Sequence, residues 1–443
     1  SVTGDQAAMP VVNPYAVLNV SFNPSEGSQS LYFDGKNFSS VNNDVMKLLN
    51  DNGIKVKVIS SGEDRFQLIM TNATIQNLEL SRGTWEIVLN GSNELKGKGK
   101  DFSGCGLRIN DWTSATIKEG TAPASLTAKN YPTTGTSRDG SSGIVVAGNL
   151  TIESGTIEAT AYAGNDSAPD SGAILVGTTG TLNINGGSVT AAGTGKKGVY
   201  VRNNFQMTGG SLKVTGSGKP GIENVGNFNL SGGTISTKSK SDGIGFFQGS
   251  GSVTIKAKEL NTDRLYITGD SSFTVASGGK VTSESTIIDR GTLTNAGEFV
   301  SNGLFEKGEG GRFNNTGTIS GTGSLPDDAK QIPDNITVYT AEISADYRDN
   351  MSINVQNLAA IQKPVNAGNL QYELAEYTGS DKGEGTIDKE RGQLRVTKAG
   401  VFKIKVNTQA SGLYEAGKNP VDITLTVNKA AFPGDWNLIV TAT

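Results

Sequence analysis

The sequence contains no histidine in its 443 residues and one cysteine, Cys105. Without histidine the chain has no Ser-His-Asp or Cys-His catalytic arrangement, no histidine-ligated zinc site, and lacks the commonest general base near neutral pH. A single cysteine excludes an internal disulfide. Because Cys105 stands between two glycines, we interpret it as a small buried residue rather than a reactive thiol.

Long apolar runs and concentrated positive charge are also missing. No stretch approaches the roughly 18 apolar residues of a membrane-spanning helix, so we expect no transmembrane segment. The net charge is −4 without a basic stripe, which argues against nucleic acid as a partner. The chain begins at Ser1 rather than at methionine, and we interpret it as the mature region of an exported protein.

Glycine, by contrast, is abundant, with 59 residues, or about 13% against a usual value near 7%. Charged residues make up 19% and aromatic residues 7%. This composition is too polar for one large compact core, yet short apolar alternations recur along the chain. It suits an elongated solenoid, in which each coil buries only a few side chains against its neighbours.

Internal repeats predict the fold of the first three quarters of the chain. Leu182–Val189, Phe205–Leu212 and Phe228–Ile235 align without gaps, and their glycine pairs end at Gly187, Gly210 and Gly233. Apolar residues two apart mark strands with one buried face, and glycines permit the positive φ of a corner. A repeat of this length without a helical pattern fits one turn of a parallel β-helix. Related segments are Leu150–Ile157, Val253–Leu260, Leu293–Phe299 and Phe313–Ile319.

Both ends of this repeat region differ from it. Residues 44–53 form the one credible helix, with Asn43 or Asp44 as its N-cap and Gly53 at its end, and we expect it within a cap over residues 1–60. A separate α+β domain there stays an alternative, as does a leucine-rich repeat for the solenoid. After the linker at Leu325–Pro333 the glycine pairs stop, and about six longer strands predict a β-sandwich.

Two resemblances add to this pattern. Residues from about 66 to 325 resemble the parallel β-helix proteins displayed or secreted by gut and cellulolytic bacteria, some of which are labelled carbohydrate-binding. The segment Leu89–Leu95 (Leu-Asn-Gly-Ser-Asn-Glu-Leu) and the repeated glycine pairs carry this resemblance. Residues from about 338 to 430 resemble bacterial immunoglobulin-like repeats through Gly385–Val396, Ala399–Val406 and Thr424–Lys429. Together they imply an extracellular or cell-surface bacterial protein, and we expect a monomer.

The predicted fold is therefore all-β. A right-handed parallel β-helix solenoid at residues 61–325 follows the helix-containing N-terminal cap at 1–60. A linker at 326–335 leads to an immunoglobulin-like β-sandwich at 336–430 and a tail at 431–443. The last repeats are shorter, so we expect the solenoid to taper toward the linker.

Strand alternation selects the candidate ligand-binding residues. If Val199 and Val201 are buried, Tyr200 and Arg202 face solvent. Aromatic rings beside charged groups and amides are typical of sugar-binding sites, although scattered rings also pack beneath loops. Applied to each coil, the alternation selects Arg108, Tyr200, Arg202, Glu223, Phe247 and Tyr266.

Other chemistry has weaker support. In the insertion at residues 163–172, Asn165, Asp166 and Asp170 offer oxygen ligands for Ca²⁺, but without EF-hand spacing, so a solvated loop is the preferred interpretation. No other cofactor is expected. The repeats contain no paired carboxylates; Asp139, Glu223, Asp242, Asp263 and Arg264 are the charged residues near strand ends.

The sequence thus favours a non-catalytic protein that binds a glycan or polysaccharide, or mediates adhesion, through the outer face of the β-helix. A purely structural stalk or presentation module is nearly as well supported. A β-helix polysaccharide lyase or glycosidase is the less favoured alternative.

Overall fold

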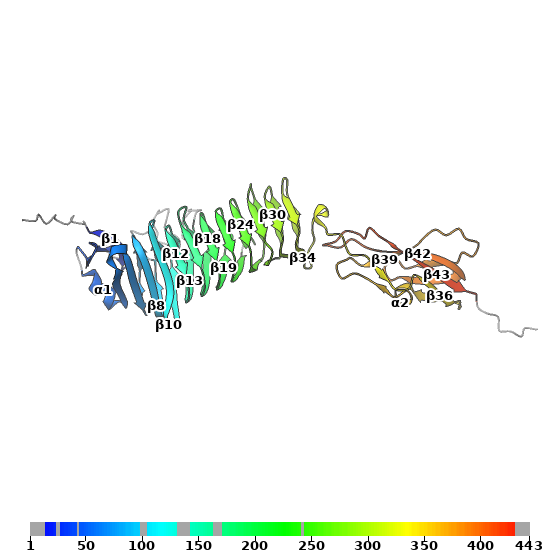
Figure 1. The fold of residues 1–443 in the computed structure, drawn as a ribbon, viewed down its shortest axis with the longest axis horizontal. Helices are drawn as coiled ribbons and strands as arrows, with labels where there is room; N and C mark the ends of the chain where they lie inside the picture. Colours follow the sequence, from blue (N-terminus) through cyan, green and yellow to red (C-terminus); the bar gives the residue numbers. More distant parts are fainter. Residues whose placement is uncertain are drawn as a thin grey trace, which may run out of the picture. The chain divides into compact units, whose positions relative to one another are not determined.

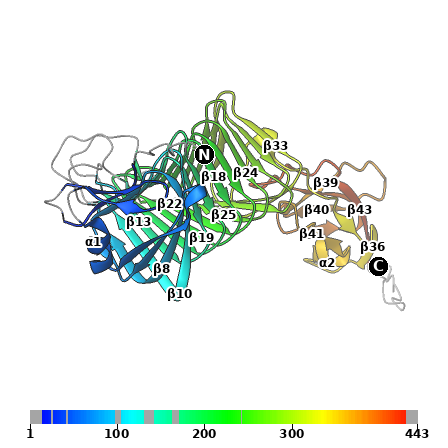
Figure 2. The same cartoon turned by 60° about the vertical axis from the view of Figure 1, so that its left-hand side comes forward.

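The computed structural model describes residues 14–23, 27–41, 44–97, 104–130, 142–162, 171–240 and 243–429. The chain divides into two compact units, residues 1–321 and 322–443, and each is described here by itself. The first unit is a solenoid of short parallel strands that stack in sequence order (Figure 1). The rotated view shows the same stack of strands from another side (Figure 2). The expectation of an all-β chain with a parallel solenoid is confirmed.

Three parallel ladders run through the solenoid, and each coil contributes one strand to each ladder. The first ladder contains β7 (Asn77–Leu80), β9 (Leu107–Ile109), β11 (Ile144–Val146), β14 (Gly172–Val176), β17 (Lys197–Val201), β20 (Ile222–Asn224), β23 (Phe246–Gln248), β26 (Leu265–Thr268), β29 (Thr286–Asp289) and β32 (Phe305–Lys307). The second contains β12 (Asn149–Ile152), β15 (Thr181–Ile184), β18 (Asn204–Met207), β21 (Asn227–Leu230), β24 (Ser252–Ile255), β27 (Ser272–Val275), β30 (Thr292–Asn295) and β33 (Arg312–Asn315).

The third ladder contains β13 (Thr156–Tyr162), β16 (Ser188–Thr194), β19 (Ser211–Gly216), β22 (Thr234–Ser239), β25 (Lys258–Thr262), β28 (Gly279–Ser283), β31 (Glu298–Ser301) and β34 (Thr318–Ser320). Two long strands, β8 (Gly83–Leu95) and β10 (Thr113–Lys129), precede the split between the second and third ladders. β10 therefore pairs with both β12 and β13. β5 (Arg65–Thr71) and β6 (Thr74–Ile75) pair in parallel with β8.

The register of the third ladder shows why the glycine pairs recur. Ser188, Ser211 and Thr234 are partners in adjacent strands, and each follows a glycine with φ of 75°, 75° and 80° respectively. A Cβ on Gly210 would lie 2.6 Å from the carbonyl oxygen of Gly187 in the coil before it. The repeat that lacks the glycine pair places Lys258 at this corner with φ 65°, a conformation that is costly for a side chain.

The core lies inside the coils, where inward residues of the three ladders meet. Phe205 stacks on Phe228 with ring centroids 4.2 Å apart, and Phe246 contacts Phe228 and Phe273 edge to face. All four rings are at most 1% exposed. The late coils are shorter, as expected, because Glu298 pairs with both Lys280 and Thr318 across short repeats.

Antiparallel strands extend the ladders at their N-terminal ends. β1 (Tyr15–Ser21) pairs with β7 and with β2 (Gln29–Phe33), which pairs with β3 (Phe38–Ser39). β4 (Ile54–Ser60) lies antiparallel on β5, and a short 3₁₀ helix at Ser61–Glu63 joins the two strands. The predicted helix is confirmed as α1 (Val45–Asp51), where the Asp44 side chain accepts a hydrogen bond from the Lys47 amide at 2.9 Å. Asn43, the alternative cap, lies outside the described residues.

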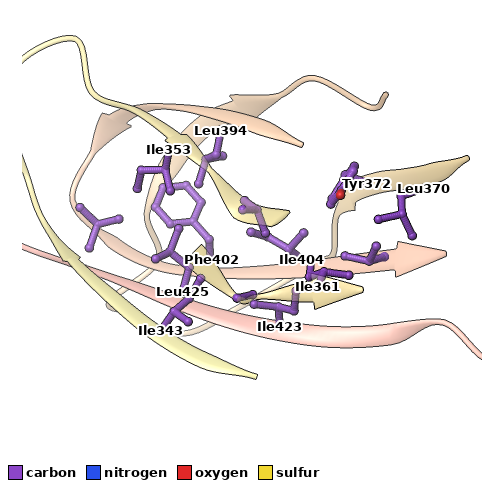
Figure 3. Close-up of a cluster of buried hydrophobic side chains, with 14 of the residues drawn as sticks. Ile343, Ile353, Ile361, Leu370, Tyr372, Leu394, Phe402, Ile404, Ile423 and Leu425 are labelled. Atoms are coloured by element: carbon purple, nitrogen blue, oxygen red, sulfur yellow. The ribbon is translucent and has the colours of Figure 1, made fainter. Parts of the chain in front are cut away.

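The second unit packs two small sheets around a shared core. A four-stranded sheet has the order β36 (Glu342–Asp346), β43 (Val421–Asn428), β42 (Gly400–Thr408) and β39 (Leu370–Leu374). A three-stranded sheet contains β37 (Ser352–Asn354), β41 (Gln393–Lys398) and β40 (Glu384–Ile387), while β35 (Thr337–Val338) pairs with β38 (Ile361–Gln362). The helices are α2 (Val355–Leu358) and a 3₁₀ turn at Asp327–Ala329. Figure 3 shows Ile353 and Leu394 of one sheet with Phe402, Ile404 and Leu425 of the other in this core.

Candidate functional site

The candidate residues predicted from strand alternation lie mostly in one row on the first ladder. Successive pairings join Glu79, Arg108, Val145, Leu175, Tyr200, Glu223, Phe247, Tyr266, Ile287 and Glu306. Their strand neighbours on both sides, such as Val199 and Val201, are fully buried inside the coils. We call this line of side chains the outward row. Neighbouring members are about 4.8 Å apart along the solenoid.

Tyr200 differs from the expectation that it faces solvent, because only 6% of it is exposed. Its ring lies beneath the ammonium group of Lys197, 3.6 Å from the ring centroid, and the Arg202 guanidinium is 6.0 Å away. Alternation decides the side of the strand on which a residue lies, but not whether neighbouring side chains cover it. Tyr200 is therefore part of a packed cluster rather than an open aromatic surface.

Glu223 belongs to the same cluster. Its carboxylate lies 3.1 Å from the Lys197 ammonium, and the side chains are 17% and 6% exposed respectively. A buried carboxylate needs such a partner, since an unpaired buried charge is costly. Arg202 is exposed and lies beyond the end of β17, at the corner that leads to β18. The row thus brings Tyr200 and Glu223 together and leaves Arg202 beside it.

Phe247 and Tyr266 form the accessible aromatic part of the row. They are partners in adjacent strands, both are partly exposed, and their ring centroids are 5.4 Å apart at an angle of 51°. Ile287 continues this apolar line in the next coil. Near the pair, Asp263 is held by the amides of Ser239 and Arg264, at 2.9 and 2.8 Å. The arrangement offers an apolar ledge with charged groups beside it.

A polar network surrounds Arg108 at the other end of the row. The Arg108 Nε donates to Asn110 Oδ1 at 2.7 Å, and the Asn110 amide donates to Glu79 Oε1. Asn19 and Ser81 also donate to this oxygen, each at 3.3 Å. Glu79 is 6% exposed, and its second oxygen has no hydrogen-bond partner. Arg108 lies three coils from Tyr200, so the structure does not bring the two together.

Burial decides the chemistry of Cys105, which lies close to this network. The side chain is 1% exposed, and burial raises the pKa of its thiol to about 12. At neutral pH the thiol is protonated and therefore a poor nucleophile.

One exposed residue was missed by the strand alternation. Trp112 is 95% exposed and has φ 64°, in the turn that joins β9 to β10. Alternation selects residues within strands, so a ring in a corner is overlooked. A tryptophan directly after Asn110 and Asp111, two residues that favour turns, is the signal that would have found it.

The remaining predicted groups are placed as follows. The candidate calcium ligands Asn165, Asp166 and Asp170 lie outside the described residues, as do Asp139 and Asp242. Within the described part of the chain, no three His, Cys, Asp or Glu residues are grouped as a metal site requires. Across the same residues no helix has the length and apolar character to cross a membrane.

No protein-family model, curated protein or solved structure matches this chain.

Proposed function

We propose that this chain is a non-catalytic bacterial protein of the cell surface or extracellular space that binds a glycan through the outer face of its first unit. In this proposal the first unit is a right-handed parallel β-helix closed by a cap over residues 1–60. The antiparallel pairing of β4 with β5 and of β1 with β7 supports that cap. The second unit is an immunoglobulin-like spacer, which its two sheets around one core support.

The pair of Phe247 and Tyr266 carries the proposal. Two neighbouring rings at 5.4 Å on a rigid ladder present a ledge about the size of one or two sugar rings. The apolar C–H face of a sugar packs on such rings, while its hydroxyl groups bond to nearby polar side chains. Asp263 lies close to the pair in sequence and in space, since its oxygens accept from amides of the adjoining corner.

Affinity electrophoresis of the full chain through gels that contain soluble polysaccharides tests this proposal. We expect at least one polymer among neutral β-glucans, mannans, xylans and pectins to retard the wild-type protein. Phe247→Ala and Tyr266→Ala should each weaken that retardation about tenfold, the equivalent of one lost aromatic contact. Tyr339→Ala is the matched control, because Tyr339 is 69% exposed but lies in the second unit. Equal retardation of all variants would contradict the assignment of the site.

A structural stalk is the second candidate, and the second ladder favours it. All sixteen outward positions on eight consecutive strands of this face, from β10 to β30, are uncharged polar residues. They are Ser114, Thr116, Asn149, Thr151, Thr181, Asn183, Asn204, Gln206, Asn227, Asn229, Ser252, Thr254, Ser272, Thr274, Thr292 and Thr294. Such a regular face carries no coherent binding chemistry and suits a spacer. For the stalk, no polymer retards the wild-type chain.

A further inference from the structure

Trp112 combines two features that folding alone does not favour. Its side chain is 95% exposed, so the indole gains almost nothing from burial. Its backbone is left-handed, with φ 64°, a conformation that is strained for a large L-residue and easy for glycine or asparagine. Residues held in such conformations cluster at binding and catalytic sites.

The corner itself does not require a large ring. The register of the second ladder places Ala147, Thr179, Arg202, Val225, Ser250, Asp270, Arg290 and Gly310 at the same corner position in later coils. Of these, Arg290 and Gly310 share the positive φ, at 62° and 74°. Small or polar residues therefore build the same turn without an aromatic side chain.

The polar network around Arg108 holds the turn that carries Trp112. The Asn110 carbonyl accepts a hydrogen bond from the Thr113 amide at 3.2 Å, which closes the turn. The Asn110 side chain is fixed at the same time by Arg108 and by the buried carboxylate of Glu79. Asp111 Oδ1 accepts from the Thr179 hydroxyl at 2.6 Å. The indole is thus exposed on a rigid support.

The neighbours of Trp112 indicate the class of ligand. The adjacent corner position is Ala147, followed by Gly148, so no second large apolar group extends the ring into a patch of the size that a protein partner buries. Asp111 and Asn110 offer hydrogen-bonding groups on the same turn. A single flat ring beside a carboxylate and an amide matches a sugar, which has an apolar face and a hydroxyl rim.

We propose that Trp112 is a second sugar-binding platform, which takes one pyranose ring of a neutral, linear polysaccharide. The proposal rests on glycan binding by this chain and extends it. The charge of Arg108 is offset by Glu79, and Asp111 adds a negative charge, so the site favours neutral over acidic sugars. Phe247 lies five coils further along, or about 24 Å at the usual strand spacing. One polymer chain therefore reaches both platforms, whereas a short oligosaccharide occupies one.

The three tryptophans allow a direct measurement. Trp85 is 1% exposed, and Trp436 lies outside the described residues. In the full chain with Trp436→Phe, iodide quenching of fluorescence reports mainly on Trp112. We expect the retarding neutral polysaccharide from the electrophoresis to protect Trp112, lowering the iodide quenching constant about twofold or more, since a bound sugar covers one face of the ring.

Matched variants separate ligand binding from backbone strain. Trp112→Asn removes the ring and accepts the left-handed φ, and Arg290→Asn makes the same backbone change at the same corner seven coils away. We expect Trp112→Asn to bind the polymer about tenfold more weakly and Arg290→Asn to bind it like the wild type.

The outcomes distinguish the two proposals. A polymer that still binds through Phe247 and Tyr266, without protection of Trp112 and without loss in Trp112→Asn, overturns the second platform and leaves glycan binding intact. Absence of binding to every polymer tested overturns both. Equal losses in Trp112→Asn and Arg290→Asn place the effect in the corner turns and also overturn the platform.

Discussion

The buried ion pair of Lys197 and Glu223 determines whether the middle of the outward row is structural. The two side chains are 3.1 Å apart and only 6% and 17% exposed, and the Lys197 ammonium also lies 3.6 Å above the ring of Tyr200. Glu223→Gln removes the negative charge at nearly constant size. Lys197→Met removes the positive charge and keeps most of the side-chain length.

The expected loss of stability follows from this geometry. At 3.1 Å two unit charges attract each other by about 5 kcal/mol at an effective dielectric constant of about 20, and desolvation offsets part of this. Removal of one partner leaves the other charge buried, so each single variant should lower the free energy of unfolding by about 3 kcal/mol. The double variant should lose less than the sum of the two, with a coupling energy of about 2 kcal/mol.

Guanidinium denaturation followed by circular dichroism measures these differences. Lys280 and Glu298 supply the control, because this pair lies in the third ladder at 3.3 Å but is 39% and 44% exposed. Glu298→Gln should cost less than about 1 kcal/mol. If Glu223→Gln is as mild as Glu298→Gln, or if the losses in the double variant are additive, the account of a structural cluster at Tyr200 is wrong.

Three further predictions concern single positions. Lys258→Gly should raise the free energy of unfolding by about 0.5–1 kcal/mol in a denaturant titration, because glycine accepts φ 65° without strain; a decrease would contradict this. Cys105, whose pKa is raised to about 12 by burial, should not react with a thiol reagent at pH 8 until the protein is unfolded, and rapid labelling of the folded chain would refute its burial. Hydrogen bonds from Lys118 and Gln67 lower the pKa of Glu86, so Glu86 stabilises the fold above its ordinary pKa of 4.5, and this contribution is lost as pH falls through the lowered value. The difference in melting temperature between the wild type and Glu86→Gln should therefore shrink on acidification, and a constant difference would contradict the assignment.

Much of the candidate site follows from alternation within strands. Because successive side chains of a strand point to opposite faces, burial of Val199 and Val201 is enough to place Tyr200 on the outside of the coil. The equal repeat length then aligns Tyr200, Glu223 and Phe247 in one row. Alternation carries no information on which long side chain folds over its neighbour, so the cover of Lys197 over Tyr200 was not predictable.

The sequence by itself determined the parallel solenoid, because glycine pairs at a fixed interval require corners where a Cβ would strike the preceding coil. It also determined the helix at α1, since Asp44 caps an amphipathic segment that ends before Gly53. Only the tertiary structure decided which outward residues are accessible. The same face of one ladder buries Tyr200 beneath a lysine and leaves Phe247 and Tyr266 partly open. Exposure depends on contacts between coils that are far apart in the sequence, and these contacts also position Trp112 on its rigid corner.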